Sequence, residues 1–258
     1  MSSQRALILD CDGVLADTER DGHLVAFNRM FQRVRAPLHW SDDEYASLVK
    51  IGGGKERLAR ALPLRRAREL GVARTEEELA STIARWHRVK TEIYRDLVVS
   101  GALSPRPGVR RLVGKCVEAG WAVAVASTSA PESVRSVVEQ VLGGGTASRV
   151  RIVAGDEVPR KKPAPDAYRM ALEALGASAG CAVAIEDSGI GCRAAVGAGI
   201  STLITVSAYT GRDDFTGAAA VLSDLGEPGC PARVLADAQG LATRGVVDVS
   251  VLEAVMGG

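Results

Sequence analysis

Four apolar runs and a shorter fifth, separated by segments with helical spacing, constrain the fold of this chain most strongly. The runs cover residues 5–10, 121–127, 182–186 and 201–206, with the shorter one at 150–154. Continuous apolar runs of this length are typical of parallel strands that are buried on both faces. Helical spacing marks the segments between them, including residues 131–142, 165–175 and 189–198. We therefore expect an α/β fold with a doubly wound, Rossmann-like parallel sheet.

Residues 19–100 interrupt this alternation. They are rich in Arg, Glu and Leu and contain no strand-like run. The stretch is too long for a crossover between neighbouring strands, so we interpret it as an inserted helical cap domain. The catalytic core would then consist of residues 1–18 and 101–258, with Pro105 and Pro107 marking the return to it.

Composition narrows the class of partner. The 258 residues carry a net charge of only +1, which does not favour nucleic acid or an anionic membrane surface. No apolar run approaches the roughly 18 residues of a membrane span. Only five residues precede the first apolar run, which leaves no room for a signal or transit peptide unless one has been trimmed.

The five cysteines do not indicate a disulfide framework or a zinc site. They are odd in number and form neither a C-x-x-C pair nor a Cys/His cluster with zinc spacing. We expect reduced thiols in a reducing compartment.

Two carboxylates, Asp10 and Asp12, follow the first apolar run directly, and Gly13 follows them. Side chains two apart on a strand project to the same side, so both acids can face one reacting atom. Gly13 lets the backbone turn away from the strand end. The arrangement suits one acid as nucleophile and the other as proton shuttle.

Three more groups of polar residues follow predicted strands. Ser127 and Thr128 precede a helix and could bind phosphate oxygens, although the same pattern is typical of a simple N-cap. Lys162 lies in a loop stiffened by prolines, where a solvated basic loop is the plainer interpretation. Glu186 and Asp187 end a strand. With Asp10 and a main-chain carbonyl near Asp12 they make a plausible Mg²⁺ site, although capping of the next helix by Asp187 or Ser188 is the plainer interpretation.

Together, this order of motifs resembles the haloacid dehalogenase-like hydrolase superfamily. The form D-x-D-G-V-x-x-D-T-E and the late E-D-S are similar to the branch that contains β-phosphoglucomutase and its phosphatase relatives. Three longer stretches resemble the CbbY-type xylulose-1,5-bisphosphate phosphatases, in particular their plant and algal forms. They are D-C-D-G-V-L-A-D-T-E-R-D-G-H with A-F-N, I-G-G-G-K-E-R, and Y-T-G-R-D-D-F.

The resemblance implies a Mg²⁺-dependent phosphatase that works through an aspartyl-phosphate. Asp10 would be the nucleophile and Asp12 the acid and base, with Ser127, Thr128 and Lys162 binding phosphate. Asp10, Asp12, Glu186 and Asp187 would supply the metal site. The expected substrate is xylulose 1,5-bisphosphate, an inhibitor of Rubisco, and the products are xylulose 5-phosphate and phosphate.

A bisphosphate needs a second cationic contact. The resemblance gives substrate recognition to five cap residues, namely Glu19, His23, Gly54, Lys55 and Arg57. From composition alone, the Gly-rich stretch before Lys55 is equally typical of a flexible helix entry with a solvated charged face.

Other functions remain open from sequence. A β-phosphoglucomutase-like mutase would use the same Asp10 and Asp12. A dehalogenase needs neither Mg²⁺ nor the acid at Asp12, and a non-catalytic sugar-phosphate-binding protein would be expected to lack at least one of the core residues, all of which are present. We expect a monomer in the chloroplast stroma, or alternatively in bacterial cytoplasm, linked to Rubisco by function and without direct contact.

Overall fold

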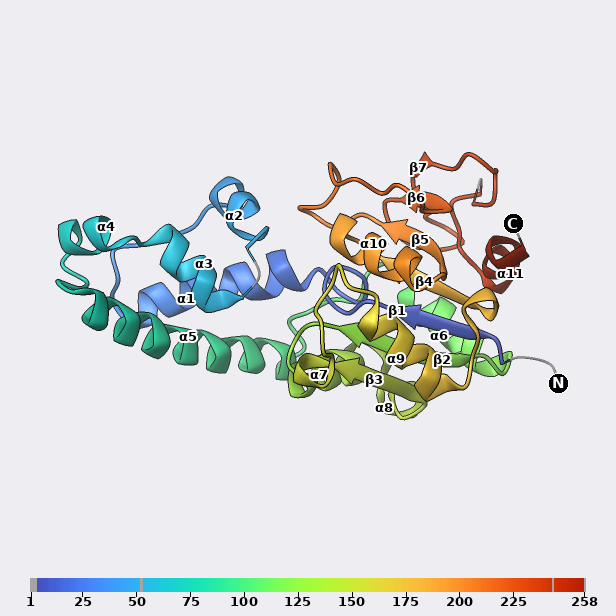
Figure 1. The fold of residues 1–258 in the computed structure, drawn as a ribbon, viewed down its shortest axis with the longest axis horizontal. Coiled ribbons are helices and arrows are strands. Elements are labelled where there is room, and N and C mark those ends of the chain that lie inside the picture. The colour runs from blue at the N-terminus through green and yellow to red at the C-terminus, as the bar shows by residue number, and fades with distance from the viewer. Residues whose placement is uncertain (1–3, 52, 243, 258) are drawn as a thin grey trace. The chain divides into compact units, whose positions relative to one another are not determined.

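One mixed sheet organises the larger part of the computed structural model, which describes residues 4–51, 53–242 and 244–257. Its strands within those residues lie in the order β3-β2-β1-β4-β5-β6-β7 (Figure 1). They are β1 (Ala6–Leu9), β2 (Ala122–Ser127), β3 (Val150–Ala154), β4 (Ala182–Glu186), β5 (Ser201–Thr205), β6 (Ala220–Leu222) and β7 (Val234–Ala236). Pairing is parallel from β3 to β6, and β7 is antiparallel to β6. The predicted doubly wound α/β class is confirmed, as are all five predicted strands.

Two strands, β6 and β7, were not predicted. Each is only three residues long. All three residues of β7 are exposed, and β6 ends an apolar run, residues 218–222, that consists mostly of alanine and holds a single β-branched residue, Val221.

Helices follow the strands along the core. They are α6 (Val109–Glu118), α7 (Pro131–Leu142), α8 (Gly144–Ala147), α9 (Asp166–Leu175), α10 (Gly189–Gly197) and α11 (Val249–Gly257), with 3₁₀ turns at Gly155–Glu157 and Ala179–Cys181. Ala6 and Ile8 of β1 pack in one apolar cluster with Tyr168 of α9 and Ala194 of α10. Because side chains alternate along a strand, Leu7 and Leu9 are buried on the opposite face of the sheet.

The chain divides into two compact units, residues 1–17 with 103–258, and residues 18–102. The smaller unit is helical within its described residues. It contains a π-helical turn (Thr18–Leu24), α1 (Val25–Arg33), α2 (Asp42–Leu48), α3 (Gly54–Ala61), α4 (Leu64–Glu69) and α5 (Glu76–Val99). The boundaries expected from sequence were 18/19 and 100/101.

Capping and aromatic packing explain the helical unit. Ser41 and Glu44 form a reciprocal capping box at the start of α2, and the Thr75 hydroxyl accepts from the Glu78 amide at the start of α5. Phe31 packs edge-on against Trp40, with ring centroids 5.1 Å apart. These rings give the unit its own core.

The two chain crossings between the units meet inside the core unit. Ala16, on the outgoing crossing, forms an antiparallel bridge with Pro105 on the returning one. The Arg106 amide donates to the Leu15 carbonyl at 3.0 Å. The core is thus closed by main-chain pairing at the point of insertion.

None of the helices among the described residues is both long enough and apolar enough to cross a membrane.

Candidate active site

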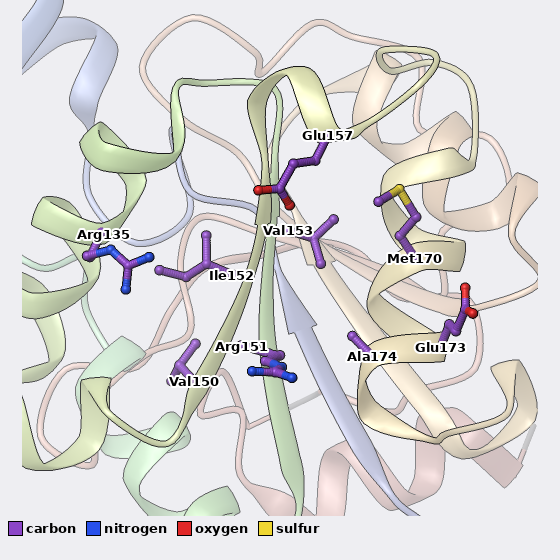
Figure 2. A pocket seen from close by; sticks show the side chains of 9 residues that line it. All are labelled: Arg135, Val150, Arg151, Ile152, Val153, Glu157, Met170, Glu173 and Ala174. Carbon is purple, nitrogen blue, oxygen red and sulfur yellow. The ribbon is translucent and has the colours of Figure 1, made fainter.

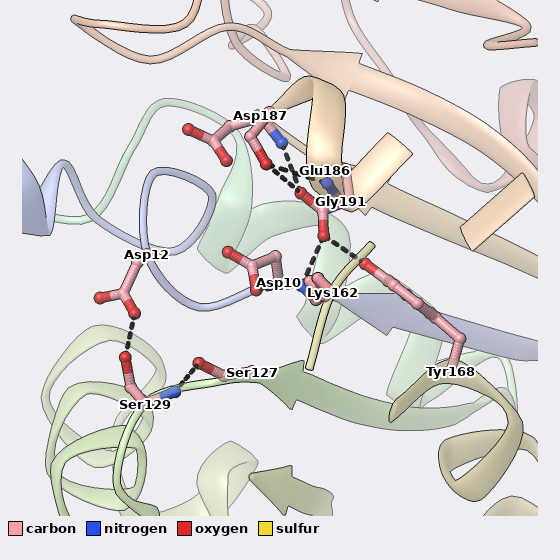
Figure 3. A network of polar contacts seen from close by, with 10 residues as sticks. Asp10, Asp12, Ser127, Ser129, Lys162, Tyr168, Glu186, Asp187 and Gly191 are labelled. Atoms are coloured by element: carbon pink, nitrogen blue, oxygen red, sulfur yellow. Dashed lines mark hydrogen bonds and ion pairs between the residues drawn. The ribbon is translucent and has the colours of Figure 1, made fainter. Parts of the chain in front are cut away.

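Three carboxylates from neighbouring strand ends meet in the core unit. Asp10 follows β1, and its amide donates to the Ile185 carbonyl of β4 at 2.9 Å. Glu186 ends β4 and Asp187 comes next. All three residues are buried, and ligand oxygens of the three lie within 4.8 Å of one another (Figure 3). The parallel register of β1 and β4 therefore produces this cluster from residues far apart in sequence.

Lys162 supplies a positive charge inside the cluster. Its ammonium group donates to Asp10 Oδ1 and to Glu186 Oε1, each at 2.5 Å. Tyr168 on α9 donates its hydroxyl to the same Glu186 oxygen at 2.6 Å. The Lys162 ammonium also lies 5.1 Å from the centre of the Tyr168 ring. The motif predicts Lys162 at the site, whereas no sequence signal predicts Tyr168, whose position in an amphipathic helix is typical of an ordinary core residue.

The single positive charge of Lys162 does not offset the three buried carboxylates of this cluster. Burial raises the pKa of Asp10 to about 7, even though the Lys162 charge opposes the shift. Burial and the neighbouring acids Glu186 and Asp10 raise the pKa of Asp187 well above its ordinary value. These shifts reflect the cost of placing carboxylates together in a dry interior.

A divalent metal ion fits the cluster. Asp10, Glu186 and Asp187 offer hard oxygen ligands, and a divalent cation would offset their mutual repulsion. Asp12 does not belong to this group of side chains; it was expected to contribute through a main-chain carbonyl. Asp10, Glu186 and Asp187 would therefore supply the side-chain ligands of such an ion.

A serine that sequence analysis left without a role positions Asp12. The Ser129 hydroxyl donates to Asp12 Oδ2 at 2.6 Å, and the Ser129 amide donates to the Ser127 hydroxyl oxygen at 3.1 Å. Ser127 is buried at the end of β2, whereas Thr128 is exposed. The S-T-S run was the available signal, but sequence could not say which hydroxyl faces Asp12.

Helix α10 begins directly behind the carboxylates. The Ser188 hydroxyl accepts from the Gly191 amide at 3.2 Å, so of the two residues predicted as possible caps, Asp187 and Ser188, it is Ser188 that caps the helix. A Cβ atom at Gly191 would lie 2.0 Å from the Glu186 carboxylate. Glycine at this position lets the helix approach the buried acid.

Within the helical unit, Arg57 and Glu19 form a buried ion pair. Arg57 Nη1 lies 2.7 Å from Glu19 Oε2 and Nη2 lies 2.9 Å from Oε1, a bidentate arrangement. Tyr45 donates its hydroxyl to Glu19 Oε2 at 2.6 Å, and Arg57 Nε donates to the Ile51 carbonyl at 2.8 Å. Burial would raise the pKa of Glu19, but nearby positive charge and the Arg57 hydrogen bonds lower it to about 2. Arg57 thus fixes Glu19 in its ionised form.

His23 is buried in the same unit. Burial and the Lys90 charge lower the pKa of His23 to about 3, so its ring is neutral and accepts from the Lys90 ammonium at 2.8 Å. Lys55 is exposed in the first turn of α3, next to Gly54. Of the preceding glycines in the predicted phosphate-binding stretch, Gly52 lies outside the described residues. All five predicted substrate-recognition residues, Glu19, His23, Gly54, Lys55 and Arg57, lie in the helical unit.

A surface pocket of about 530 Å³ lies elsewhere in the core, along strand β3 (Figure 2). Arg135, Arg151, Glu157 and Met170 are among its lining residues, and none of the predicted site residues lines it.

The chain is similar to known hydrolases over most of its length. The family model for haloacid dehalogenase-like hydrolases matches residues 4–199. A CBBY-like protein from Arabidopsis thaliana is 42% identical over 227 residues, covering 86% of this chain and 70% of the relative. The plasmid-encoded protein CbbY of Cupriavidus necator is 41% identical over 228 residues, covering 88% of each chain.

A solved structure shows the same fold. The crystal structure of a CbbY mutant from Rhodobacter sphaeroides, in complex with xylulose-(1,5)bisphosphate, matches with a TM-score of 0.73 and 36% identity. The match covers 88% of this chain and 96% of that one. On the family model and these relatives, the chain belongs to the haloacid dehalogenase-like hydrolase family and is a phosphatase.

Proposed function

We propose that this chain is a Mg²⁺-dependent sugar-bisphosphate phosphatase that hydrolyses xylulose 1,5-bisphosphate to xylulose 5-phosphate and phosphate. The observation that carries the proposal is the cluster of three buried carboxylates, Asp10, Glu186 and Asp187, beside the ammonium group of Lys162. Such a cluster suits a phosphoryl group because it combines an oxygen nucleophile with cationic groups that offset phosphate charge.

In the first step, an Asp10 carboxylate oxygen attacks phosphorus in line with the departing sugar oxygen. A phosphorus–oxygen bond to Asp10 forms as the bond to the sugar breaks, and Asp12 gives its proton to the sugar oxygen. In the second step, Asp12 removes a proton from water, and the water oxygen attacks the phosphorus of the aspartyl-phosphate. Phosphate leaves, the Asp10 carboxylate is restored and Asp12 is protonated again.

Other residues hold the reacting group. Lys162 and the Ser127 hydroxyl would bind phosphoryl oxygens, with Thr128 contributing from the same turn. When bound by Asp10, Glu186, Asp187 and the main chain at Asp12, Mg²⁺ would supply charge that stabilises the phosphoryl oxygens. Ser129 keeps the Asp12 carboxylate oriented through the hydrogen bond at 2.6 Å.

The substrate assignment rests on the relatives and on the helical unit. The CbbY of Rhodobacter sphaeroides was solved in complex with xylulose-(1,5)bisphosphate, and this chain matches it over 88% of its length. We assign recognition of the sugar to Glu19 and His23, and of the second phosphate to Lys55 beside Gly54. Arg57 supports this set by fixing Glu19.

A phosphate-release screen tests the proposal. Purified protein is assayed with Mg²⁺ on sugar mono- and bisphosphates, including xylulose 1,5-bisphosphate, and the products are separated to detect isomerised sugar phosphate. We expect the highest kcat/KM with xylulose 1,5-bisphosphate and no activity in the Asp10→Asn variant. Isomerised product without phosphate would instead identify a mutase, and substantial turnover by Asp10→Asn would overturn the nucleophile assignment.

The cellular role follows from the substrate. Removing a Rubisco inhibitor would support carbon fixation without contact between the two proteins. Relatives occur in a plant and in bacteria. We place the protein in the chloroplast stroma, with bacterial cytoplasm as the alternative, and fractionation of the source cells with a specific antibody distinguishes the two.

A further inference from the structure

Arg106 occupies the core unit where the chain returns from the helical insertion, and its guanidinium group joins three segments. It donates through Nη1 to the carbonyl of Gly13 and, at 2.8 Å, to that of Thr205. It donates through Nη2 to the carbonyls of Val206 at 2.6 Å and Ser223 at 2.5 Å. A planar fork can satisfy several carbonyl groups at once, which an ammonium group cannot do in the same geometry.

One of these segments is the turn that follows Asp10 and Asp12. Gly13 has a φ of 84°, and its amide donates to the Ala16 carbonyl at 2.9 Å. A Cβ atom at Gly13 would lie 2.2 Å from Asp187 Oδ2. The backbone that Arg106 holds is therefore packed directly against the carboxylate of Asp187.

The second segment also contacts Asp187. Val206, whose carbonyl accepts from Arg106, precedes Ser207, and the Ser207 hydroxyl hydrogen-bonds to Asp187. The Ser207 amide donates to the Thr210 hydroxyl oxygen at 2.9 Å, which holds this turn in place. Arg106 therefore donates hydrogen bonds to both backbone segments that contact Asp187.

An electrostatic attraction between Arg106 and Asp187 adds to these hydrogen bonds. Burial lowers the pKa of Arg106, and the Asp187 carboxylate opposes that shift.

We propose that Arg106 is a positioning residue for the metal side of the active site, because it holds the Gly13 turn and the Ser207 turn against Asp187. The inference rests on the proposed Mg²⁺-dependent function. It adds to that function a residue whose described hydrogen bonds go to Gly13, Thr205, Val206 and Ser223 rather than to the three carboxylates of the cluster.

The competing explanation is that Arg106 only stabilises the fold, and the chain offers a matched control. Arg111 on α6 is also largely buried and donates to main-chain carbonyls, to Val247 at 2.9 Å and to Gly226 at 2.7 Å. Its partners lie in the C-terminal segment and include none of the proposed active-site residues. Substituting either arginine removes hydrogen bonds to main-chain carbonyls, and at Arg111 also the ion pair with Glu227, but only Arg106 of the two holds the turn beside Asp187.

The experiment compares Arg106→Gln, Arg106→Lys and Arg111→Gln with the unchanged protein. Mg²⁺ affinity is measured by calorimetry without substrate, stability by the Tm, and kcat and KM by hydrolysis of p-nitrophenyl phosphate. Residues that orient metal ligands typically contribute about 10-fold to 100-fold to metal affinity, so we expect a Mg²⁺ Kd raised by that factor in Arg106→Gln. Arg106→Lys should fall between Arg106→Gln and the unchanged protein, since it keeps the charge and loses the fork.

Both glutamine variants should have a lower Tm, while Arg111→Gln keeps the original Mg²⁺ Kd and kcat. In Arg106→Gln, kcat should fall more than KM rises. Equal Mg²⁺ Kd values in Arg106→Gln and the unchanged protein would overturn the inference. If Arg106→Gln does not fold, an unaltered Kd in folded Arg106→Lys would overturn it as well.

Failure of the proposed function has a different signature. In that case the unchanged protein binds Mg²⁺ but releases no phosphate from xylulose 1,5-bisphosphate, and the comparison of Mg²⁺ Kd values among the variants still decides the role of Arg106.

Discussion

The Ser129 hydroxyl donates a hydrogen bond to Oδ2 of Asp12 at 2.6 Å, across 117 positions of sequence. The contact joins the end of β2 to the turn after β1. It leaves the Asp12 carboxylate one defined orientation toward a leaving group, because a short hydrogen bond to a carboxylate is strongly directional.

Replacing Ser129 with alanine should therefore slow turnover. A hydrogen bond to a charged group contributes about 1.5–3 kcal/mol, so kcat should fall on the order of tenfold or more. KM should change little, since Ser129 acts through Asp12 rather than on the sugar. Steady-state kinetics on p-nitrophenyl phosphate measure both values.

Ser136→Ala is the control for that experiment, because the Ser136 hydroxyl donates at 2.9 Å to the Glu132 carbonyl within α7. Its kcat should match that of the unchanged protein. Equal kcat values for Ser129→Ala and Ser136→Ala would contradict the positioning of Asp12 by Ser129.

Gly191→Ala should displace the Glu186 carboxylate, against which the first turn of α10 packs. The added Cβ would lie 2.0 Å from the Glu186 carboxylate, so either α10 or Glu186 must move. Overpacking of this kind costs about 1–3 kcal/mol of unfolding free energy, and the displaced acid should also bind Mg²⁺ more weakly. Denaturant unfolding and calorimetry test the two effects.

The matched substitution is Gly197→Ala at the other end of the same helix, where a Cβ atom would lie 3.8 Å from Pro165. Alanine favours a helix over glycine by up to about 1 kcal/mol, so this variant should be as stable as the unchanged protein or more so. Equal loss of stability in the two variants would show that the contact with Glu186 does not matter.

Mg²⁺ should stabilise the protein more strongly as pH rises. The pKa of Asp10 is raised from 3.8 to about 7 in the folded protein. Without metal, the folded state therefore holds a proton that the unfolded chain releases, and this group's contribution to the free energy of unfolding falls as pH rises from about 4 to about 7. A metal ion binds the ionised carboxylate, so it should reverse this loss.

The measurement is the Tm with and without Mg²⁺ between pH 5.5 and pH 8. The difference should grow as pH rises through about 7, the folded-state pKa of Asp10. A difference that is constant over this range would contradict a Mg²⁺ site built on Asp10.

Lys55→Ala should separate bisphosphate from monophosphate substrates. If the Lys55 cation binds the second phosphate, its removal raises KM for xylulose 1,5-bisphosphate by about 10-fold or more and leaves KM for p-nitrophenyl phosphate nearly unchanged. Lys50→Ala removes another exposed cation of the same unit and serves as control. A similar rise in KM for both substrates would refute the proposed role of Lys55.

Local patterns predicted much of the fold. The apolar runs located β1 to β5, because a strand buried on both faces needs a continuous apolar segment. They could not locate β7, whose three residues are exposed and paired with β6 by tertiary contacts alone. The carboxylates and Lys162 could be predicted because each belongs to a motif that follows a predicted strand.

The hydrogen-bond partners of those residues could not be predicted from the sequence. Tyr168 looks like any apolar helix residue until α9 packs on the sheet and brings its hydroxyl to Glu186. Ser129 and Arg106 likewise gain their roles from segments about a hundred positions away. Arg106 lies between two prolines and Arg111 lies in α6, but neither setting predicts a role, since only the fold determines which carbonyl groups each one meets.

The bridge between Ala16 and Pro105 has a consequence for how such proteins diversify. This main-chain pairing holds together the two core segments between which the helical insert lies, and it involves no residue of the insert. A chimera that carries a different insert between these two residues would retain every side chain assigned here to bond breaking. Replacement of the insert can therefore change the range of substrates, while the catalytic residues of the core stay the same.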